Sequence, residues 1–336
     1  MDQQPFDFKN ILVIHFGQLG DVVLGLPALR AIRERFPQAH ITVLAGKVPD
    51  QVIRLSGLAD EVIAVDRVEL RDGPKLRSVG KIIKLVWMVR RLPAELVIDL
   101  HSLAETNILA FLSRAKYRLL ANRESRSLDI LSNFRPKPPR EDKSKHLRER
   151  YLDVLTPLGV EWTSDQIFLV ASSGDSEYVD KAFFSGTMPT VGLFPGAGHP
   201  SRCWALENFA ALAVRLAAEG QRPAVFLGPE EAGMREKVSR SFPENTVIID
   251  GLSIAQFIAA AGRLEMFVTN DTGPMHLAAC AGSPVLLLLD EKAPTTYLPM
   301  TDRLEIVQHG PIAGIAVDEV YRAVASLRSK IHAVGK

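Results

Sequence analysis

Short apolar segments alternate with segments of helical periodicity along nearly the whole chain. The apolar segments are rich in Val, Ile and Leu, which is typical of strands that are buried on both faces of a sheet. Helices between such strands imply right-handed crossovers, and therefore parallel sheets covered by helices on both sides. The pattern predicts an α/β protein built from doubly wound, Rossmann-like domains.

Four pairs of a strand and a helix are expected in the first part of the chain. The strands are expected at 11–16, 41–45, 61–65 and 95–100, and the helices at about 21–36, 49–56, 79–92 and 102–114. Around 120–145 the chain becomes polar, basic and proline-containing. Helical spacing of apolar residues then returns over 146–159.

The alternation restarts after a stretch of loop-forming residues at 172–188. Strands are expected at 190–196, 223–228, 246–250, 265–271 and 283–289, and helices at 205–220, 231–241, 254–262, 274–282 and 317–330. A length of 336 residues favours two domains. We expect an N-terminal domain over 1–172 and a C-terminal domain over 188–336, which face each other across a cleft. The last helix is a candidate to pack back on the N-terminal domain.

The two halves carry opposite net charge, although the whole chain is close to neutral at +1. Residues 1–172 hold 26 Lys and Arg against 21 Asp and Glu, whereas residues 173–336 hold 14 against 18. The basic half is either a solvated face or a surface for an anionic partner or a membrane. Nucleic acid is a less favoured partner, because no aromatic residues interleave with the basic ones.

The sequence favours a protein of the reducing cytoplasm. Its two cysteines are far apart and lack CxxC spacing, which indicates neither a disulfide framework nor a zinc site. The first ten residues do not have the pattern of a secretory signal. The longest apolar run, near 279–289, is interrupted by Gly282 and Pro284 and is too short to span a bilayer. No DxD, HxH or HxxxH spacing occurs, so we expect no bound metal and no cofactor.

Ligands of open parallel sheets bind at the carboxyl ends of the strands, where the following helices begin. The first such junction is GQLGD at 17–21. Gly17 and Gly20 permit a tight turn with the backbone close to a ligand, and Asp21 stands at the helix start. Asp21 is either a helix cap or a catalytic carboxylate. Hydrogen bonds to its own helix would lower its pKa and make it a weaker base.

A second junction is FPGAGHPSRCW at 194–204, after the first strand of the second domain. Gly196 permits backbone contact with an anion, and Arg202 supplies a fixed positive charge. A surface loop with an incidental arginine remains the alternative.

A third junction, TNDTGPMHLAAC at 269–280, is more specific. Asp271 and Thr272 precede a helix that begins at Gly273, so hydroxyl and amide donors lie at the positive end of the helix dipole. This arrangement suits a phosphate or diphosphate, and His276 in the first turn would add a donor.

Two further strand ends carry polar side chains. The strand ending in DLHS holds Asp99 and His101, of which we expect one to line the cleft. In GPEEAG, either Glu230 or Glu231 could receive ribose or sugar hydroxyls, although solvated acids at a helix start are the alternative.

These junctions, in this order, resemble the ADP-heptose:lipopolysaccharide heptosyltransferase family over most of the chain. The resemblance is carried by ILVIHFGQLGDVVLGLPALRAIRERFP, FPGAGHPSRCWALENFAALAVRL and FVTNDTGPMHLAACAGSPV. It implies two Rossmann-like domains of the inverting, metal-independent glycosyltransferase B type. It further implies that the N-terminal domain binds the acceptor and the C-terminal domain binds the nucleotide-sugar donor.

The resemblance also implies roles for the residues at the junctions. Asp21 matches the family's aspartate that takes the proton of the acceptor hydroxyl. Thr272, the Gly273 amide and His276 would stabilise charge on the leaving diphosphate, and Asp271 would bind donor hydroxyls. The acceptor would be an anionic precursor of the lipopolysaccharide inner core at the cytoplasmic membrane face, which fits the basic N-terminal half.

Three positions depart from the family pattern. His15 stands where members commonly have Arg, Arg202 where they have Lys, and His101 where they often have Gln. These departures leave two alternatives open. One is a related transferase with another nucleotide-sugar or surface-glycan acceptor, and the other is a catalytically silent nucleotide-sugar-binding protein.

Overall fold

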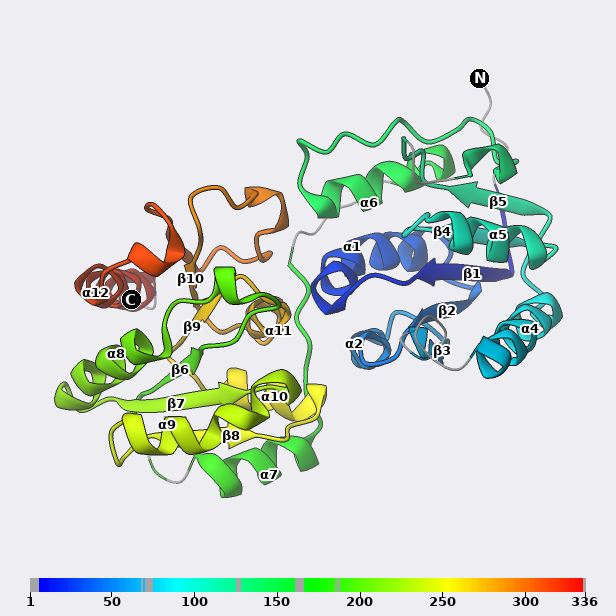
Figure 1. Ribbon diagram of the computed structural model, residues 1–336. Coiled ribbons are helices and arrows are strands. Elements are labelled where there is room, and N and C mark those ends of the chain that lie inside the picture. The colour runs from blue at the N-terminus through cyan, green and yellow to red at the C-terminus, as the bar shows by residue number, and fades with distance from the viewer. Residues whose placement is uncertain are drawn as a thin grey trace. The chain divides into compact units, whose positions relative to one another are not determined.

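The computed structural model describes residues 6–67, 69, 75–124, 128–160, 166–184, 186 and 188–334. The chain divides into two compact units, Met1–Asp165 with Thr296–Leu298 and Gln166–Thr295 with Pro299–Lys336. Each unit is built around its own sheet (Figure 1). All strand pairs in both sheets are parallel, which confirms the predicted α/β, doubly wound fold class.

The N-terminal unit has a five-stranded sheet in the order β3-β2-β1-β4-β5. Its strands are β1 (Asn10–His15), β2 (His40–Gly46), β3 (Glu61–Val65), β4 (Leu96–Asp99) and β5 (Tyr117–Leu120). Its helices are α1 (Leu19–Arg35), α2 (Pro49–Ser56), α4 (Lys75–Arg91), α5 (Ala104–Leu112) and α6 (Leu147–Leu155), with 3₁₀ turns η1 (Asp129–Leu131) and η2 (Thr156–Leu158).

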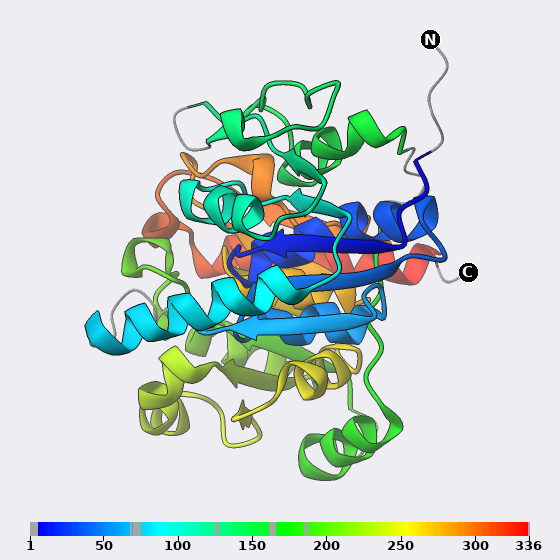
Figure 2. The same ribbon diagram turned by 90° about the vertical axis from the view of Figure 1, so that its right-hand side faces the viewer.

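The residues of β1 alternate between the two faces of this sheet. Leu12 and Ile14 enter the apolar core under α4 and α5, which cover the face turned toward the viewer in Figure 2. His15 lies on the opposite side, in contact with Gly25 of α1. The last residue of β1 therefore points toward the helix that starts with the GQLGD turn.

The C-terminal unit has a six-stranded sheet in the order β11-β10-β9-β6-β7-β8. Its strands are β6 (Thr190–Phe194), β7 (Arg222–Leu227), β8 (Val247–Asp250), β9 (Met266–Asn270), β10 (Val285–Leu288) and β11 (Leu304–Val307). Its helices are α7 (Ser173–Phe183), α8 (Leu206–Ala218), α9 (Arg235–Ser241), α10 (Ile254–Ala261), α11 (Gly273–Cys280) and α12 (Val317–Val334). Three 3₁₀ turns complete it, η3 (Pro200–Arg202), η4 (Pro229–Met234) and η6 (Ile312–Gly314), whereas η5 (Thr295–Tyr297) lies mostly in the N-terminal unit.

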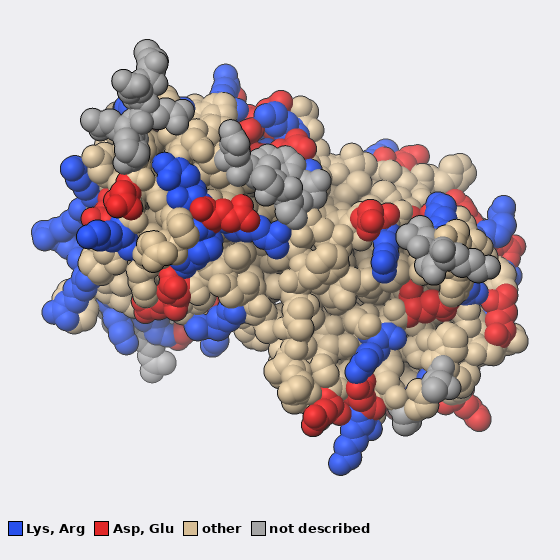
Figure 3. Space-filling model, turned by 180° about the vertical axis from the view of Figure 1, so that it is seen from behind, with Lys and Arg blue, Asp and Glu red and all other residues tan. Residues whose placement is uncertain are grey.

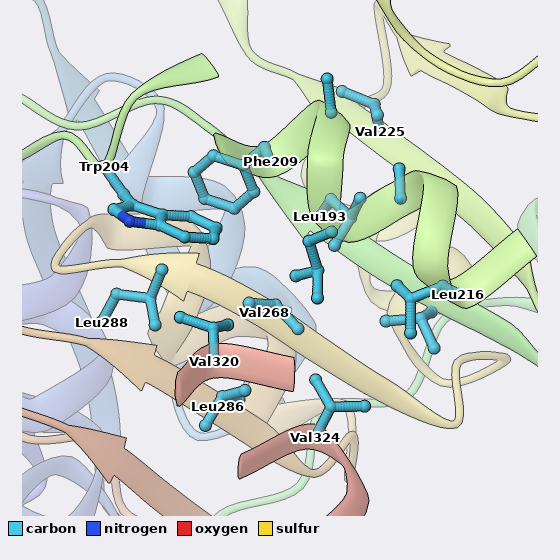
Figure 4. Close-up of a cluster of buried hydrophobic side chains, with 14 of the residues drawn as sticks. Leu193, Trp204, Phe209, Leu216, Val225, Val268, Leu286, Leu288, Val320 and Val324 are labelled. Carbon is cyan, nitrogen blue, oxygen red and sulfur yellow. The ribbon is translucent and has the colours of Figure 1, made fainter. Parts of the chain in front are cut away.

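Trp204 anchors the loop after β6 in the core of this unit (Figure 4). Its ring meets Phe209 edge-on, with 5.0 Å between centroids. Its indole N–H donates to the Ile315 carbonyl at 2.8 Å. The loop is therefore held at both ends, by β6 and by this buried ring.

Two strands and one helix of the described chain were missed by the sequence pattern. Strands β5 and β11 lie at sheet edges, where one neighbour suffices and polar residues such as Arg118 and Glu305 are tolerated. Helix α7 occupies the stretch where the domain boundary was predicted, and it packs against α10 of the second unit. Val179 is the one buried residue of α7, so its apolar pattern is weak.

Helix α12 packs against α8 and β11 of its own unit. Its packing on the N-terminal unit stays a prediction. In the described parts of the chain, no helix combines the length and the apolar character needed to cross a membrane.

Candidate active site

Asp21 folds back onto the start of α1. The helix begins at Leu19, two residues earlier than predicted, so Asp21 is its third residue and Gln18 is the N-cap. One carboxylate oxygen, Oδ2, accepts from the Gln18 backbone N–H at 3.0 Å. Asp21 therefore does serve as a helix cap. It does so in a capping box, where its side chain accepts a hydrogen bond from the residue before the helix.

Burial raises the pKa of Asp21 above the usual aspartate value. The Gln18 N–H and the positive charges of Arg123, Arg150 and Arg67 act in the opposite direction, and burial outweighs them. The capping bond does lower the pKa of Asp21, as expected, but burial reverses the net direction of the shift. Desolvation makes Asp21 a better proton acceptor than an exposed aspartate.

Gly17 gives Asp21 and His15 room to approach. A Cβ at Gly17 would lie 2.5 Å from the Asp21 Cβ and 2.8 Å from the His15 ring. The Gly17 N–H donates to His15 Nδ1 at 3.2 Å, so the ring closes the turn. Gly20 is the second residue of α1 and is partly exposed.

His15 and His101 are both neutral. The pKa of each is lowered to about 3, mainly by burial, and the positive charge of Arg123 contributes to both shifts. Their ring centroids are 6.1 Å apart, and Tyr151 meets the His15 ring edge-on at 4.9 Å. Neutral imidazoles suit hydroxyl groups better than anions, because each offers one donor and one acceptor.

Two arginines share one carboxylate beside this cluster. Arg123 Nε lies 3.3 Å and Arg150 Nη2 lies 3.0 Å from Glu141 Oε1, and all three side chains are nearly buried. Arg123 also donates to the His101 carbonyl at 2.6 Å. The group carries one net positive charge, which would attract an anionic ligand.

Asp99, the other candidate of the DLHS segment, has a structural role. It is fully buried, and its carboxylate accepts from the Ser102 N–H and the Asn107 amide, both at 2.7 Å. These bonds hold the turn between β4 and α5. His101, two residues later, lies beside His15, and we call Asp21, His15, His101 and Tyr151 the Asp21 cluster.

Asn270 links the second and third junctions, which both lie in the C-terminal unit. This buried residue ends β9, and its amide donates to the carbonyls of Pro195 and Gly196 at 2.9 and 3.2 Å. Its side-chain oxygen accepts from the Trp204 N–H at 3.0 Å. The loop after β6 is thereby tied to the start of α11.

The start of α11 has the predicted form. Thr272 is the N-cap, Gly273 is the first helical residue, and the Thr272 hydroxyl makes no capping bond to the described part of the helix. His276 is buried in the first turn. The hydroxyl and the Gly273 amide are donors at the positive end of the helix dipole.

Arg202 and Asp271 bring opposite charges to this helix start. Arg202 Nη1 lies 3.8 Å from Asp271 Oδ2. Burial raises the pKa of Asp271, and the arginine charge acts against that rise. The Arg202 guanidinium is largely exposed. It brings the positive charge of the second junction next to the predicted phosphate site.

Glu231, rather than Glu230, lies against the loop after β6. A Cβ at Gly196 would be 2.1 Å from Glu231 Oε1, and the Gly228 N–H donates to Oε2 at 3.1 Å. Glu231 is buried and its pKa is raised by burial, whereas Glu230 is exposed. Of the two acids that the sequence left open, Glu231 is the one that contacts the loop, and Gly196 makes room for its carboxylate. Donor binding by Glu230 stays a prediction.

Sequence reasoning missed several of these residues. In the N-terminal unit they are Arg123, Glu141, Arg150 and Tyr151, which come from segments where the strand and helix pattern is interrupted or resumes. No local motif marks them. Asn270 did stand at a predicted strand end, which was the available signal for its role. No group of His, Cys, Asp and Glu within the described ranges has the arrangement of a metal site.

The comparisons with known proteins all point to one family of glycosyltransferases. The sequence model of glycosyltransferase family 9 (heptosyltransferase) matches residues 82–315. The chain is 23% identical over 318 residues to lipooligosaccharide heptosyltransferase 2 of Haemophilus influenzae, covering 89% of this chain and 88% of that protein. It is 24% identical over 315 residues to lipopolysaccharide heptosyltransferase 2 of Escherichia coli, with 89% and 88% covered.

Solved structures show the same fold. A family 9 glycosyltransferase from Veillonella parvula superposes with a TM-score of 0.82 at 23% identity, over 97% of this chain and 99% of that one. The E. coli heptosyltransferase WaaC solved with ADP superposes with a TM-score of 0.79 at 16% identity, over 95% and 99%.

Proposed function

The chain belongs to glycosyltransferase family 9, and we propose that it transfers heptose from ADP-heptose to an anionic acceptor of the lipopolysaccharide inner core. The donor is supported by similar heptosyltransferases that were solved with ADP and with ADP-2-deoxy-2-fluoro heptose. The acceptor is supported by relatives that are lipopolysaccharide and lipooligosaccharide heptosyltransferases.

The environment of Asp21 carries the mechanistic part of the proposal. In an inverting transfer, the acceptor hydroxyl attacks the anomeric carbon while ADP leaves from the opposite face, and a base takes the hydroxyl proton. Asp21 is a carboxylate whose pKa is raised by burial. Because Oδ2 is bonded to the Gln18 N–H, we assign proton transfer to Oδ1.

The start of α11 would bind the leaving diphosphate. Negative charge grows on the phosphate oxygens as the glycosidic bond breaks, and donors that are already in place stabilise it. The Thr272 hydroxyl, the Gly273 amide and His276 are at this helix start, and Arg202 adds a positive charge. Asp271 and Glu231 would accept from sugar or ribose hydroxyls. No metal ion has a role in this scheme.

The N-terminal unit would bind the acceptor. Figure 3 shows many Lys and Arg side chains on this unit, at the left of the view. The net positive group of Arg123, Glu141 and Arg150 lies beside the cluster that includes Asp21. His101, being neutral, would contact an acceptor hydroxyl. An acceptor embedded in a membrane would place the enzyme at the cytoplasmic face as a peripheral protein.

One experiment tests the proposal. The protein is incubated with ADP-heptose and heptose-deficient lipopolysaccharide precursors, and the products are examined by mass spectrometry. We expect the mass increment of one heptose with the wild-type protein and, over the same short incubation, at most a trace of it with Asp21→Asn, which should still bind ADP. No increment with any precursor would refute the proposed acceptor, and full turnover by Asp21→Asn would refute the proposed base.

The departures at Arg202 and His101 favour a test of the donor as well. Thermal shift with a panel of nucleotide-sugars identifies the donor, because a ligand of the native state raises Tm by mass action. A larger shift with another sugar nucleotide would replace heptose in the proposal. Binding of ADP-heptose without transfer or hydrolysis would point to a silent binding protein.

A further inference from the structure

Helix α4 has an apolar stripe on the side that faces away from its own sheet. Val79, Ile83 and Trp87 are spaced four residues apart and therefore lie on one face of the helix. Their side chains are 53%, 63% and 54% exposed. Ile82, which is 47% exposed, broadens the stripe.

This stripe is not needed to hold the helix in place. Elsewhere on α4, Val89 is part of the apolar core of the unit, and Leu85, Val86 and Met88 pack against that core. The helix thus has two apolar sides, one buried and one exposed. An exposed apolar stripe of this extent indicates a surface that binds a membrane or another protein.

The neighbouring elements α5 and η1 also carry exposed apolar side chains. Ile108 and Phe111 of α5 are 45% and 49% exposed, and Ile130 of η1 is 84% exposed. Helix α5 packs beside α4, and η1 packs beside α5. Figure 2 shows α4 and α5 on the side of the sheet toward the viewer. We call the surface formed by the outward sides of α4, α5 and η1 the α4–α5 face.

Basic residues dominate the charge of α4. The sequence KLRSVGKIIKLVWMVRR contains six Lys and Arg and no Asp or Glu. Lys84, Arg90 and Arg91 are exposed beside the apolar stripe. The Arg91 guanidinium lies 3.3 Å from the centre of the Trp87 ring. Nearby acids are in part paired, Glu69 with Lys81 and Asp129 with Lys137, while Glu105 of α5 is exposed.

We propose that the α4–α5 face docks onto an anionic lipid bilayer. Exposed Ile, Val, Phe and Trp side chains beside Lys and Arg suit a bilayer surface, where apolar groups enter the acyl boundary and cations meet lipid phosphates. Trp favours the headgroup region, and Arg91 against its ring can reach a phosphate. A protein partner fits less well, because protein interfaces are depleted of Lys.

The inference rests on the proposed function in one respect, that the acceptor is a lipid in a membrane. Docking through this face would bring the N-terminal unit, with the Asp21 cluster, to the surface that displays the acceptor. Binding to vesicles is measured without donor or acceptor, so this inference and the proposed transfer can fail separately.

The test uses the full-length protein and vesicles of phosphatidylcholine alone or mixed equally with phosphatidylglycerol. We expect the protein to float with the mixed vesicles and to stay largely unbound with phosphatidylcholine alone. Ile83→Glu should weaken binding on the order of tenfold or more, since it removes an apolar contact and adds an acid. Lys84→Gln with Arg90→Gln should weaken it about fivefold per residue.

Matched variants on the other unit serve as controls. Val214, 56% exposed on α8, is changed to Glu, and the exposed Lys292 and Arg322 are changed to Gln. These variants should bind vesicles as the wild type does. The emission of Trp87, obtained as the difference between wild type and Trp87→Phe, should shift to shorter wavelength with the mixed vesicles.

Three results would overturn the inference. One is equal binding to both kinds of vesicle or to neither, and another is unchanged binding of Ile83→Glu. The third is a dimer in sedimentation velocity that Ile83→Glu dissociates, together with a wild-type protein that does not bind vesicles. That result would make this face an interface between two copies.

On an acceptor without its lipid tail, Ile83→Glu should transfer at the wild-type rate.

Discussion

Asp21 accepts a hydrogen bond at 3.0 Å from the backbone N–H of Gln18, the residue that caps its own helix. The carboxylate that would take a proton from the acceptor therefore also stabilises the helix start. The two roles can be separated by substitution. Asparagine keeps an oxygen that accepts from the Gln18 N–H but cannot act as a base, whereas alanine keeps neither property.

Asp21→Asn should lower kcat by roughly 10²–10⁴ and leave the free energy of unfolding within about 0.5 kcal/mol of wild type. Asp21→Ala should lose the same activity and a further ~1 kcal/mol of stability. Steady-state kinetics and urea denaturation measure the two effects. Equal stability of both variants would show that the bond to Gln18 contributes nothing.

The pH dependence of the rate should follow Asp21. Its raised pKa means that the basic form is present above that pKa and is lost as the pH falls through it. The acid limb of kcat/KM should therefore lie above the ordinary aspartate value of about 3.9. His15 and His101, with pKa values of about 3, should add no limb near neutral pH. A limb near pH 6.5 that His101→Gln removes would contradict their burial.

Asp99 should make the protein less stable as the pH rises. Burial raises its pKa from 3.8 to about 6, so the folded state holds a proton that the unfolded chain releases. Its contribution is fully present below pH 3.8 and is lost as the pH rises to about 6, by roughly 3 kcal/mol at most. Asp99→Asn should flatten this part of a plot of unfolding free energy against pH. If Asp99→Asn left the slope of unfolding free energy against pH unchanged, other groups would be responsible for that pH dependence.

Gly25 and His15 should be strongly coupled in stability. A Cβ at Gly25 would lie 2.6 Å from His15 Nε2, and the ring is held on its other side by Gly17. Gly25→Ala alone should destabilise by about 1–3 kcal/mol, although alanine favours a helix. In a His15→Ala background the same change should stabilise by up to about 1 kcal/mol. A double-mutant cycle with no coupling would show that the ring can move aside.

Gly196 and Gly198 provide a matched pair in one loop. A Cβ at Gly196 would overlap the Glu231 carboxylate, whereas a Cβ at Gly198 would have no atom within 4 Å in the described structure. Gly196→Ala should weaken ADP binding by at least tenfold, on the order of 1.4 kcal/mol, by shifting the loop. Gly198→Ala should have no effect on ADP binding. Calorimetric titration with ADP compares them, and equal affinities would exclude this contact from the donor site.

Most of the fold could be predicted from the sequence, because the buried strands of a parallel sheet form apolar runs that are visible without tertiary information. Helix α2 and strand β3 were predicted with the observed bounds, 49–56 and 61–65. The edge strands β5 and β11 were not, since a strand with one neighbour does not need an unbroken apolar run.

The candidate site was predictable only where its residues stand at strand ends. The periodicity and the junction motifs by themselves determined the two parallel sheets and the positions of Asp21, Thr272 and Gly273. Tertiary structure decided which acid lies against Gly196, and it brought Arg123, Glu141 and Arg150 together from distant segments. It also decided the direction of the Asp21 pKa shift, because desolvation depends on everything packed around a carboxylate and local sequence reports only its own helix.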